Sequence, residues 1–188
     1  MDQESSWLVT GGAGYIGSHV VDIFIRNNQR VVVIDTLIKG LESRLKYLEN
    51  VHGTKIPMIQ GDIRDEELLN KIFRKFKIKG VIHLAALKSV RESFEKPKEY
   101  YEVNFEATSL LVKKLKEYNI NKIVFSSTAA VYGMQVKTNL VTENDRLNPI
   151  SPYGKSKMDA EKIVDSFLAE QGKFGSSLRF FNVIGASK

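Results

Sequence analysis

Residues 10–17 read TGGAGYIG, and this stretch decides the fold. It follows a short apolar run and opens an amphipathic segment, so it lies where a strand would pass into a helix. Gly11, Gly14 and Gly17 have the spacing of a turn in which glycine lets the backbone approach a pyrophosphate. The N-terminus of the following helix would offer free N–H groups to the phosphates. An ordinary glycine turn is the alternative, but the strand–helix position favours a dinucleotide site.

Short β-branched runs alternate with longer amphipathic segments along the rest of the chain. We expect strands at residues 7–10, 30–35, 55–60, 80–84, 120–126 and 176–181. We expect helices at residues 15–27, 41–50, 65–76, 97–118 and 152–170. This alternation predicts an α/β fold, a Rossmann-like, doubly wound parallel sheet with helices on both faces. Residues 133–151 lack clear periodicity, and we expect them to form a surface loop near the site. We expect residues 1–188 to form one dinucleotide-binding domain.

Composition narrows the classes of protein that fit. The 188 residues include no cysteine, so neither a disulfide framework nor a thiolate metal site is possible, and we expect a cytoplasmic protein. No apolar run approaches the ~20 residues that span a bilayer, and no metal-ligand cluster is seen, so we expect neither membrane nor metal. The formal net charge of +6 is attributed to solvated lysines mixed with acidic residues, so we expect no nucleic-acid partner.

Acidic residues at two strand ends suit the adenosine half of a dinucleotide. Asp35 ends the second predicted strand about 20 residues past the glycine turn, where a carboxylate accepts from ribose hydroxyls and repels a 2′-phosphate. It therefore predicts NAD rather than NADP, although a capping aspartate is an alternative. Asp62 and Ile63 follow the third strand and are expected at the adenine, although Asp62 would equally suit a helix cap. His83 lies within an apolar strand, and we interpret it as structural.

Three residues near the end of the chain form a catalytic pattern. Tyr153 and Lys157 stand four residues apart in SPYGKSK, so a helix would place both on one face. A nearby ammonium lowers the pKa of a tyrosine from about 10, which makes it a usable base. Thr128, in FSSTAAVYG, comes at the carboxyl end of the fifth strand, where such folds bind ligands. Its hydroxyl is expected to bond the reacting oxygen, and a capping role is the alternative.

Together these motifs resemble the extended short-chain dehydrogenase/reductases over nearly the whole chain. Within that family the likeness is closest to the UDP-glucose 4-epimerases, through HLAALKSVRES at residues 83–93, YYEVN at residues 100–104 and LRFFNVIGA at residues 178–186. The resemblance implies coenzyme contacts, beyond the residues above, from Tyr15, Ile16, Leu84, Ala85, Ala86, Lys88, Asn104, Tyr153, Lys157 and Phe181. It implies substrate contacts from Lys88, Thr128, Tyr153 and Asn182.

The resemblance also implies a reaction. Tyr153 would deprotonate the 4-hydroxyl of a UDP-hexose while NAD takes the C4 hydride, and return of that hydride to the other face of the 4-keto intermediate gives the epimer. Relatives continue into a C-terminal substrate region that this chain lacks, so the chain alone is expected to bind NAD but to turn over substrate weakly. A homodimer is implied as well.

Other functions remain as alternatives. Sibling enzymes are uronate or N-acetylhexosamine 4-epimerases, decarboxylases and 4,6-dehydratases, and dehydratases carry an Asp-Glu pair where this chain has Ala129 and Ala130. A non-catalytic, coenzyme-sensing module is a further alternative, and the Thr128, Tyr153 and Lys157 set argues against it.

Overall fold

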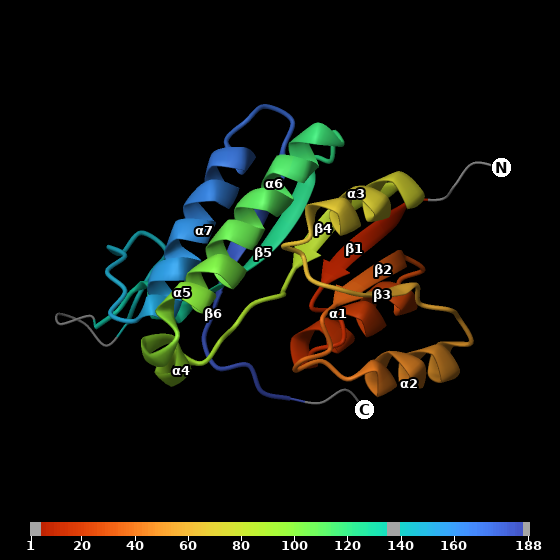
Figure 1. Ribbon diagram of the computed structural model, residues 1–188, viewed down its shortest axis with the longest axis horizontal. Coiled ribbons are helices and arrows are strands. Elements are labelled where there is room, and N and C mark those ends of the chain that lie inside the picture. The colour runs from red at the N-terminus through yellow and green to blue at the C-terminus, as the bar shows by residue number, and fades with distance from the viewer. Residues whose placement is uncertain (1–4, 135–139, 186–188) are drawn as a thin grey trace.

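Six parallel strands form one twisted sheet in a computed structural model that describes residues 5–134 and 140–185 (Figure 1). Their order across the sheet is β3-β2-β1-β4-β5-β6. The strands are β1 (Ser6–Thr10), β2 (Arg30–Asp35), β3 (Met58–Gln60), β4 (Ile78–His83), β5 (Lys122–Thr128) and β6 (Phe174–Phe180). The chain reverses its winding direction between β1 and β4, as in dinucleotide-binding folds. The predicted doubly wound fold is confirmed.

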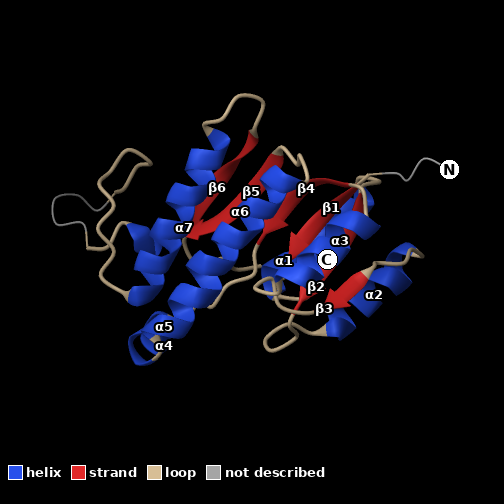
Figure 2. Cartoon of the chain, turned by 45° about the horizontal axis from the view of Figure 1, so that its top comes forward, coloured by secondary structure: helices blue, strands red, loops and turns tan. Residues whose placement is uncertain are grey.

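Helices pack on both faces of this sheet (Figure 2). They are α1 (Tyr15–Arg26), α2 (Glu42–His52), α3 (Glu66–Lys75), α4 (Val90–Glu95), α5 (Pro97–Tyr101), α6 (Ala107–Glu117) and α7 (Pro152–Leu168). A π-helical turn, η1 (Glu102–Glu106), joins α5 to α6, and a 3-10 turn, η2 (Ala129–Val131), follows β5.

Alternate strand residues enter two separate hydrophobic cores. Leu8 and Val32 pack with α3, α6 and α7, whereas their neighbours Val9 and Val33 pack with α1 and α2. This alternation follows from the two-residue period of a strand, and it explains why the strands read as nearly continuous apolar runs. On the α1 and α2 side, Phe174 and Leu178 of β6 stay exposed, because no helix of the described residues covers that part of the sheet.

The helical segment predicted at residues 97–118 is confirmed as uninterrupted helical backbone over residues 97–117, but it contains a π-helical turn. It divides into α5, η1 and α6, and the short helix α4 before it was not predicted. The Ser89 hydroxyl accepts from the Glu92 N–H and starts α4, and Pro97 then opens α5. The π turn adds a residue that periodicity does not reveal, so this change of helix type cannot be read from the sequence.

Strand boundaries differ from the sequence predictions by a few residues. β3 begins only at Met58, because Pro57 has no N–H to join the ladder. Thr128 is the last residue of β5 rather than the first residue after it, and Leu84 lies just past β4. The described part of the predicted surface loop is irregular, and its residues 135–139 lie outside the described residues. No helix in the described part of the chain is long and apolar enough to cross a membrane.

Candidate active site

The predicted site residues gather along the edge of the sheet where the parallel strands end. Thr10, Asp35, His83 and Thr128 are the last residues of β1, β2, β4 and β5. Chain segments leaving the six strands, together with the first two turns of α1 and α7, carry the other predicted residues except Asn104, which lies in η1. Because parallel strands share their carboxyl edge, residues far apart in sequence meet in one place.

The glycine-rich turn between β1 and α1 leaves no room for side chains. Gly11 has φ +70°, and a Cβ added there would lie 2.8 Å from the Ala85 nitrogen. A Cβ at Gly17 would lie 2.1 Å from the Gly11 carbonyl oxygen. Gly14 is the N-cap of α1, and no side chain caps this helix, so Tyr15 and Ile16 begin it with backbone N–H groups facing outward. The turn therefore forms a cradle suited to a pyrophosphate.

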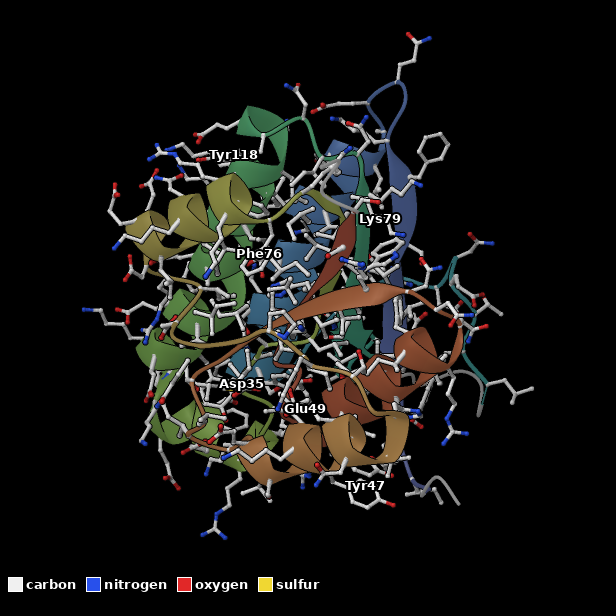
Figure 3. All side chains as sticks on the ribbon, turned by 90° about the vertical axis from the view of Figure 1, so that its right-hand side faces the viewer. Asp35, Tyr47, Glu49, Phe76, Lys79 and Tyr118 are labelled. Atoms are coloured by element: carbon white, nitrogen blue, oxygen red, sulfur yellow. The ribbon has the colours of Figure 1, made fainter. Side chains whose placement is uncertain are left out.

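Asp35 supports this turn from the end of β2, where its carboxylate lies buried (Figure 3). One oxygen accepts from the Ala13 N–H at 3.0 Å, and the other accepts from the Leu37 N–H at 2.9 Å. A carboxylate has about four acceptor positions, so two remain for ribose hydroxyls. Asp35 thus both shapes the glycine turn and keeps capacity for a ligand.

Asp62 and Ile63 follow β3 but differ in environment. Asp62 accepts from the Arg64 guanidinium at 2.7 and 3.0 Å and from the Arg64 backbone N–H. Burial opposes ionisation of Asp62, yet these bonds from Arg64 hold the pKa of its carboxyl below the ordinary value. The Ile63 side chain is buried in the core shared with α3 and α6. Asp62 is therefore the more accessible of the two for an adenine amino group.

The segment past β4 passes directly beside the glycine turn. Leu84, Ala85 and Ala86 are half-buried there, and Lys88 is exposed further along. Asn104 lies in η1 and is buried, with its side chain bonded to the backbone of Leu87. The structure therefore brings Leu84–Ala86 to the cradle, whereas Asn104 contacts the protein itself.

Thr128 and Tyr153 meet at the carboxyl edge. Ser151 caps α7 by accepting from the Gly154 N–H at 3.0 Å, and Pro152 occupies the first turn, so Tyr153 projects from the helix start. Burial raises the pKa of Tyr153, while a hydrogen bond with the Thr128 hydroxyl lowers it, and the net shift is upward. The phenol is therefore protonated at neutral pH.

Lys157 is fully buried one turn after Tyr153. Its ammonium lies 4.2 Å from the centre of the Phe125 ring, and burial lowers its pKa from 10.5 to about 7. We expected this ammonium to lower the pKa of Tyr153, but the pKa of Tyr153 is raised. The reason is that burial of the phenol outweighs its bond with Thr128, while the Lys157 ammonium faces the Phe125 ring.

This buried lysine predicts a pH-dependent stability. The unfolded chain keeps the Lys157 proton until about pH 10.5, whereas the folded chain loses it near pH 7, so the unfolded state binds more protons between these values. The free energy of unfolding of the native chain, relative to Lys157→Met, should therefore rise by up to a few kcal/mol from pH 7 to about pH 10. Urea unfolding of both chains across this range measures it. If the difference in free energy of unfolding between the two chains stayed constant with pH, Lys157 would not lose its proton near pH 7 in the folded chain.

A buried ion pair behind the catalytic residues was not predicted from the sequence. The Glu161 carboxylate, 2% exposed, accepts from Arg179 on β6 at 2.5 and 3.0 Å and from the Ser127 hydroxyl on β5 at 2.5 Å. Arg179 also donates to the Tyr132 hydroxyl at 2.9 Å. Glu161 follows Lys157 by one helical turn, and this four-residue spacing is the sequence feature that could have indicated its place behind the catalytic residues. The pair fixes β5, β6 and α7 to one another beside Thr128.

The residues past β6 turn back along the sheet edge. Phe181 is 68% exposed, and Asn182 is exposed as well. Figure 1 shows the segment beyond β6 crossing toward α1, where the Tyr15 hydroxyl donates to the Gly185 carbonyl. The structure therefore carries this segment to the glycine turn, although it does not bury Phe181 and Asn182 against the other site residues.

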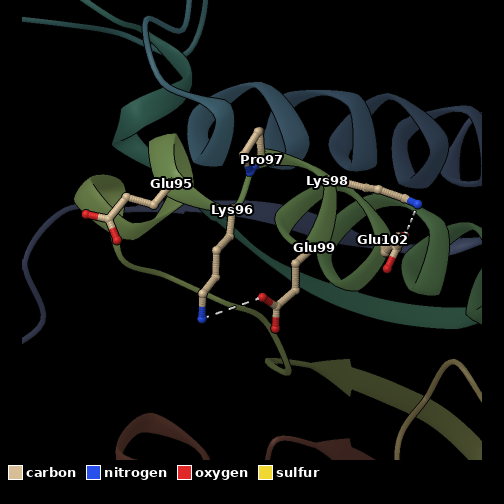
Figure 4. Close-up of a pocket in the computed structure, with 6 residues that line it drawn as sticks. All are labelled: Glu95, Lys96, Pro97, Lys98, Glu99 and Glu102. Atoms are coloured by element: carbon tan, nitrogen blue, oxygen red, sulfur yellow. Dashed lines mark ion pairs between the residues drawn. The ribbon is translucent and has the colours of Figure 1, made fainter.

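A surface hollow lies over α4, α5 and η1 (Figure 4). It is lined by Glu95, Lys96, Pro97, Lys98, Glu99 and Glu102. Lys96 pairs with Glu99 at 3.8 Å and Lys98 pairs with Glu102 at 3.7 Å, so four of its five charged side chains are paired within the hollow. The described residues contain no cluster of three or more His, Asp or Glu side chains that would hold a metal ion.

The chain belongs to the family described as GDP-mannose 4,6 dehydratase, whose model matches residues 8–188. This confirms the predicted membership of the extended short-chain dehydrogenase/reductase type. The chain is 44% identical to a UDP-glucose 4-epimerase of Halalkalibacterium halodurans, over 95% of this chain and 51% of that protein.

Two solved structures of UDP-glucose 4-epimerases share the fold. One, from Bifidobacterium longum in complex with NAD⁺ and UDP, has a TM-score of 0.91 at 37% identity, covering 97% of this chain and 55% of that one. The other, from Stenotrophomonas maltophila with bound NAD and formylated UDP-arabinopyranose, has a TM-score of 0.91 at 34% identity, with the same coverage. The chain spans about half the length of these proteins.

Proposed function

We propose that the chain is the NAD-binding part of a UDP-hexose 4-epimerase. The observation that carries this proposal is the meeting of Thr128 and Tyr153, with Lys157 one turn away, at the sheet edge that also holds the glycine cradle. The 4-epimerases similar to this chain in sequence and structure support the same reaction.

The cradle fits a dinucleotide, because Gly11 permits the tight turn and Gly17 lets the start of α1 pack closely on it, which leaves the N-terminus of α1 available to a pyrophosphate. Asp35 would bind the adenosine ribose, and Asp62 with Ile63 would lie near the adenine. Leu84, Ala85 and Ala86 would line the groove, with Lys88 beside the coenzyme and Phe181 toward the nicotinamide, and Asn104 would support this wall through its bonds to Leu87. When bound, NAD would accept the hydride from the sugar C4 and return it to the opposite face.

The chain itself supplies the proton chemistry. Tyr153 would take the proton of the sugar 4-hydroxyl as hydride leaves, and return it when hydride comes back. Thr128 would hydrogen-bond the same oxygen, and Lys157 would favour the ionised phenol once its own proton is held. Lys88 and Asn182 would contact the nucleotide sugar.

Substitution at Asp35 should change coenzyme discrimination. Asp35→Asn keeps the side-chain size but removes the charge that repels a 2′-phosphate. We expect NAD affinity to fall roughly tenfold, because charge-assisted bonds to the ribose hydroxyls are worth about 1.5–3 kcal/mol, while NADP affinity stays equal or rises. Titration of both coenzymes by calorimetry measures this. Unchanged affinities for both would contradict the ribose role of Asp35.

Epimerisation without added coenzyme tests the proposed function. The full-length gene product is incubated with UDP-galactose, and UDP-glucose is sought by chromatography. Conversion supports a 4-epimerase that retains NAD. Failure with NAD supplied would contradict it in favour of another nucleotide sugar, such as a UDP-uronate or UDP-N-acetylhexosamine. A dehydratase is disfavoured, because Ala129 and Ala130 carry no acid or base beside Thr128.

We also propose a homodimer and a cytoplasmic protein. Phe94 on α4 is 60% exposed and Tyr101 on α5 is exposed, next to α7, which supports an apolar contact between two such helical faces. Light scattering of the purified protein gives the oligomeric state. The absence of cysteine supports the cytoplasm.

A further inference from the structure

Three polar side chains lie buried beneath the point where the chain leaves β4. They are Thr10 at the end of β1, His83 at the end of β4 and Thr108 in α6, and none is more than 1% exposed. The Thr10 hydroxyl and His83 Nδ1 are 2.7 Å apart, and His83 Nε2 and the Thr108 hydroxyl are 2.9 Å apart. The imidazole therefore joins the strand that enters the glycine turn to a helix on one face of the sheet.

The neighbouring bonds fix the direction of each hydrogen bond in this chain. The Thr10 hydroxyl oxygen accepts from the backbone N–H groups of Leu84 and Ala85, both at 3.2 Å, so its own proton goes to His83 Nδ1. The Thr108 hydroxyl donates to the Asn104 carbonyl at 2.7 Å, so it accepts from His83 Nε2. Only the tautomer with the proton on Nε2 satisfies every bond.

The environment of the ring keeps it neutral. Burial, with a smaller contribution from the Lys157 charge, lowers the pKa of His83 to about 3. The ring also lies 5.6 Å from the Phe125 ring, centre to centre. The two backbone N–H donors direct the Thr10 hydroxyl proton toward Nδ1. A second ring proton on Nδ1 would therefore lie against that hydroxyl proton.

The bonds continue from Thr108 to the helix of Tyr153. Asn104 donates to the Leu87 carbonyl and accepts from the Leu87 N–H, both at 2.9 Å, and also donates to the Ser156 hydroxyl at 3.1 Å. Ser156 in turn donates to the Tyr153 carbonyl at 2.8 Å. The π turn η1 places Asn104 where it can make these bonds. One hydrogen-bonded path thus runs from the glycine turn to the first turn of α7.

We propose that His83 is a positioning residue: with its ring proton on Nε2, it holds Thr10 so that Leu84 and Ala85 stay against the glycine turn in the arrangement that binds the coenzyme. The margin is small, since a single Cβ at Gly11 would already approach the Ala85 nitrogen to 2.8 Å. This inference rests on the proposed function for the identity of the ligand, but the bond directions do not depend on it.

Nuclear magnetic resonance of ¹⁵N-histidine protein tests the bond directions without any ligand. The chain has three histidines, and loss of a signal in His83→Gln and His52→Gln assigns them. At pH 7 long-range ¹H–¹⁵N correlations should show His83 with a protonated Nε2 and an unprotonated Nδ1. A proton on Nδ1 alone, a charged ring, or averaging between tautomers would overturn the proposal.

Coenzyme affinity tests the positioning role. Thr10→Val keeps the shape but removes the hydroxyl, whereas Thr10→Ser keeps the hydroxyl, and His52→Gln is a control that removes a half-buried histidine away from the site. We expect Thr10→Val to weaken NAD binding about tenfold and Thr10→Ser to restore most of it. Equal NAD affinity of folded Thr10→Val and Thr10→Ser would overturn the positioning role.

If Thr10→Val does not fold, His83→Asn against His83→Leu makes the same comparison, because asparagine keeps a polar atom near the position of Nδ1, which faces Thr10. Weaker NAD binding by His83→Leu than by His83→Asn supports the proposal, and equal binding overturns it. A native chain that binds no NAD would contradict the proposed function, while the tautomer measurement would still judge the hydrogen-bond chain.

Discussion

Tyr153→Phe should lower the turnover of UDP-galactose by the full-length gene product by about 10²- to 10⁴-fold, the range general acid–base groups contribute. The change removes only the phenolic oxygen that would carry the sugar proton. NAD binding should change little, because the cradle and Asp35 are untouched. Steady-state kinetics with a chromatographic assay, together with the NAD content of the purified protein, measure both effects.

Tyr47→Phe is the matched control for this substitution. Tyr47 lies on α2 and is 67% exposed (Figure 3), and α2 packs with α1 rather than with β5. Its replacement should leave turnover unchanged. If Tyr153→Phe kept more than about half the native rate, another group would have to move the sugar proton, and the proposed role of Tyr153 would be wrong.

Arg179→Met should destabilise the folded chain by about 3–5 kcal/mol, because Glu161 would stay buried without its cationic partner. For a chain of this size, that corresponds to a fall in Tm of roughly 6–20 °C. Thermal and urea unfolding of the chain measure it. The same loss should loosen β5 beside Thr128, since Ser127 also donates to Glu161.

Two further variants separate the charge effect from lost packing. Glu161→Leu combined with Arg179→Met removes both charges and should recover much of the lost stability. Lys46→Met removes an ion pair with Glu42 in which both side chains are exposed, and should cost no more than about 1 kcal/mol. If the double variant were less stable than Arg179→Met alone, an unpaired buried charge would not explain the loss.

The sheet could be predicted from sequence because each strand is a short β-branched run between helical segments. Val31, Val32 and Val33 face alternate cores, so periodicity alone cannot orient them, but the fold class follows from the alternation of segments. The π turn at Glu102–Glu106 could not be predicted, since an inserted residue in a helix leaves the apolar pattern nearly intact. The start of α4 was not predicted, because a serine such as Ser89 caps a helix only where a backbone N–H, here that of Glu92, faces its hydroxyl.

Site residues that belong to a short sequence motif could be predicted from the sequence more easily than residues whose partners are distant in the sequence. Gly11, Asp35 and the Tyr153–Lys157 pair are recognisable from neighbours in sequence. Glu161 and Arg179 are 18 residues apart, and only the packing of α7 against β6 brings them together. The pKa of Lys157 likewise depends on burial against Phe125, which spacing does not reveal.

The fate of the hydrogen at C4 tests the central claim most directly. The full-length gene product is given UDP-galactose that carries deuterium at C4 of the sugar, in ordinary water, and the UDP-glucose formed is analysed by mass spectrometry and nuclear magnetic resonance. Hydride transfer within one site predicts that the product keeps its deuterium at C4. Product that has exchanged this deuterium for solvent hydrogen would contradict a transient oxidation by bound NAD, and with it the proposed reaction.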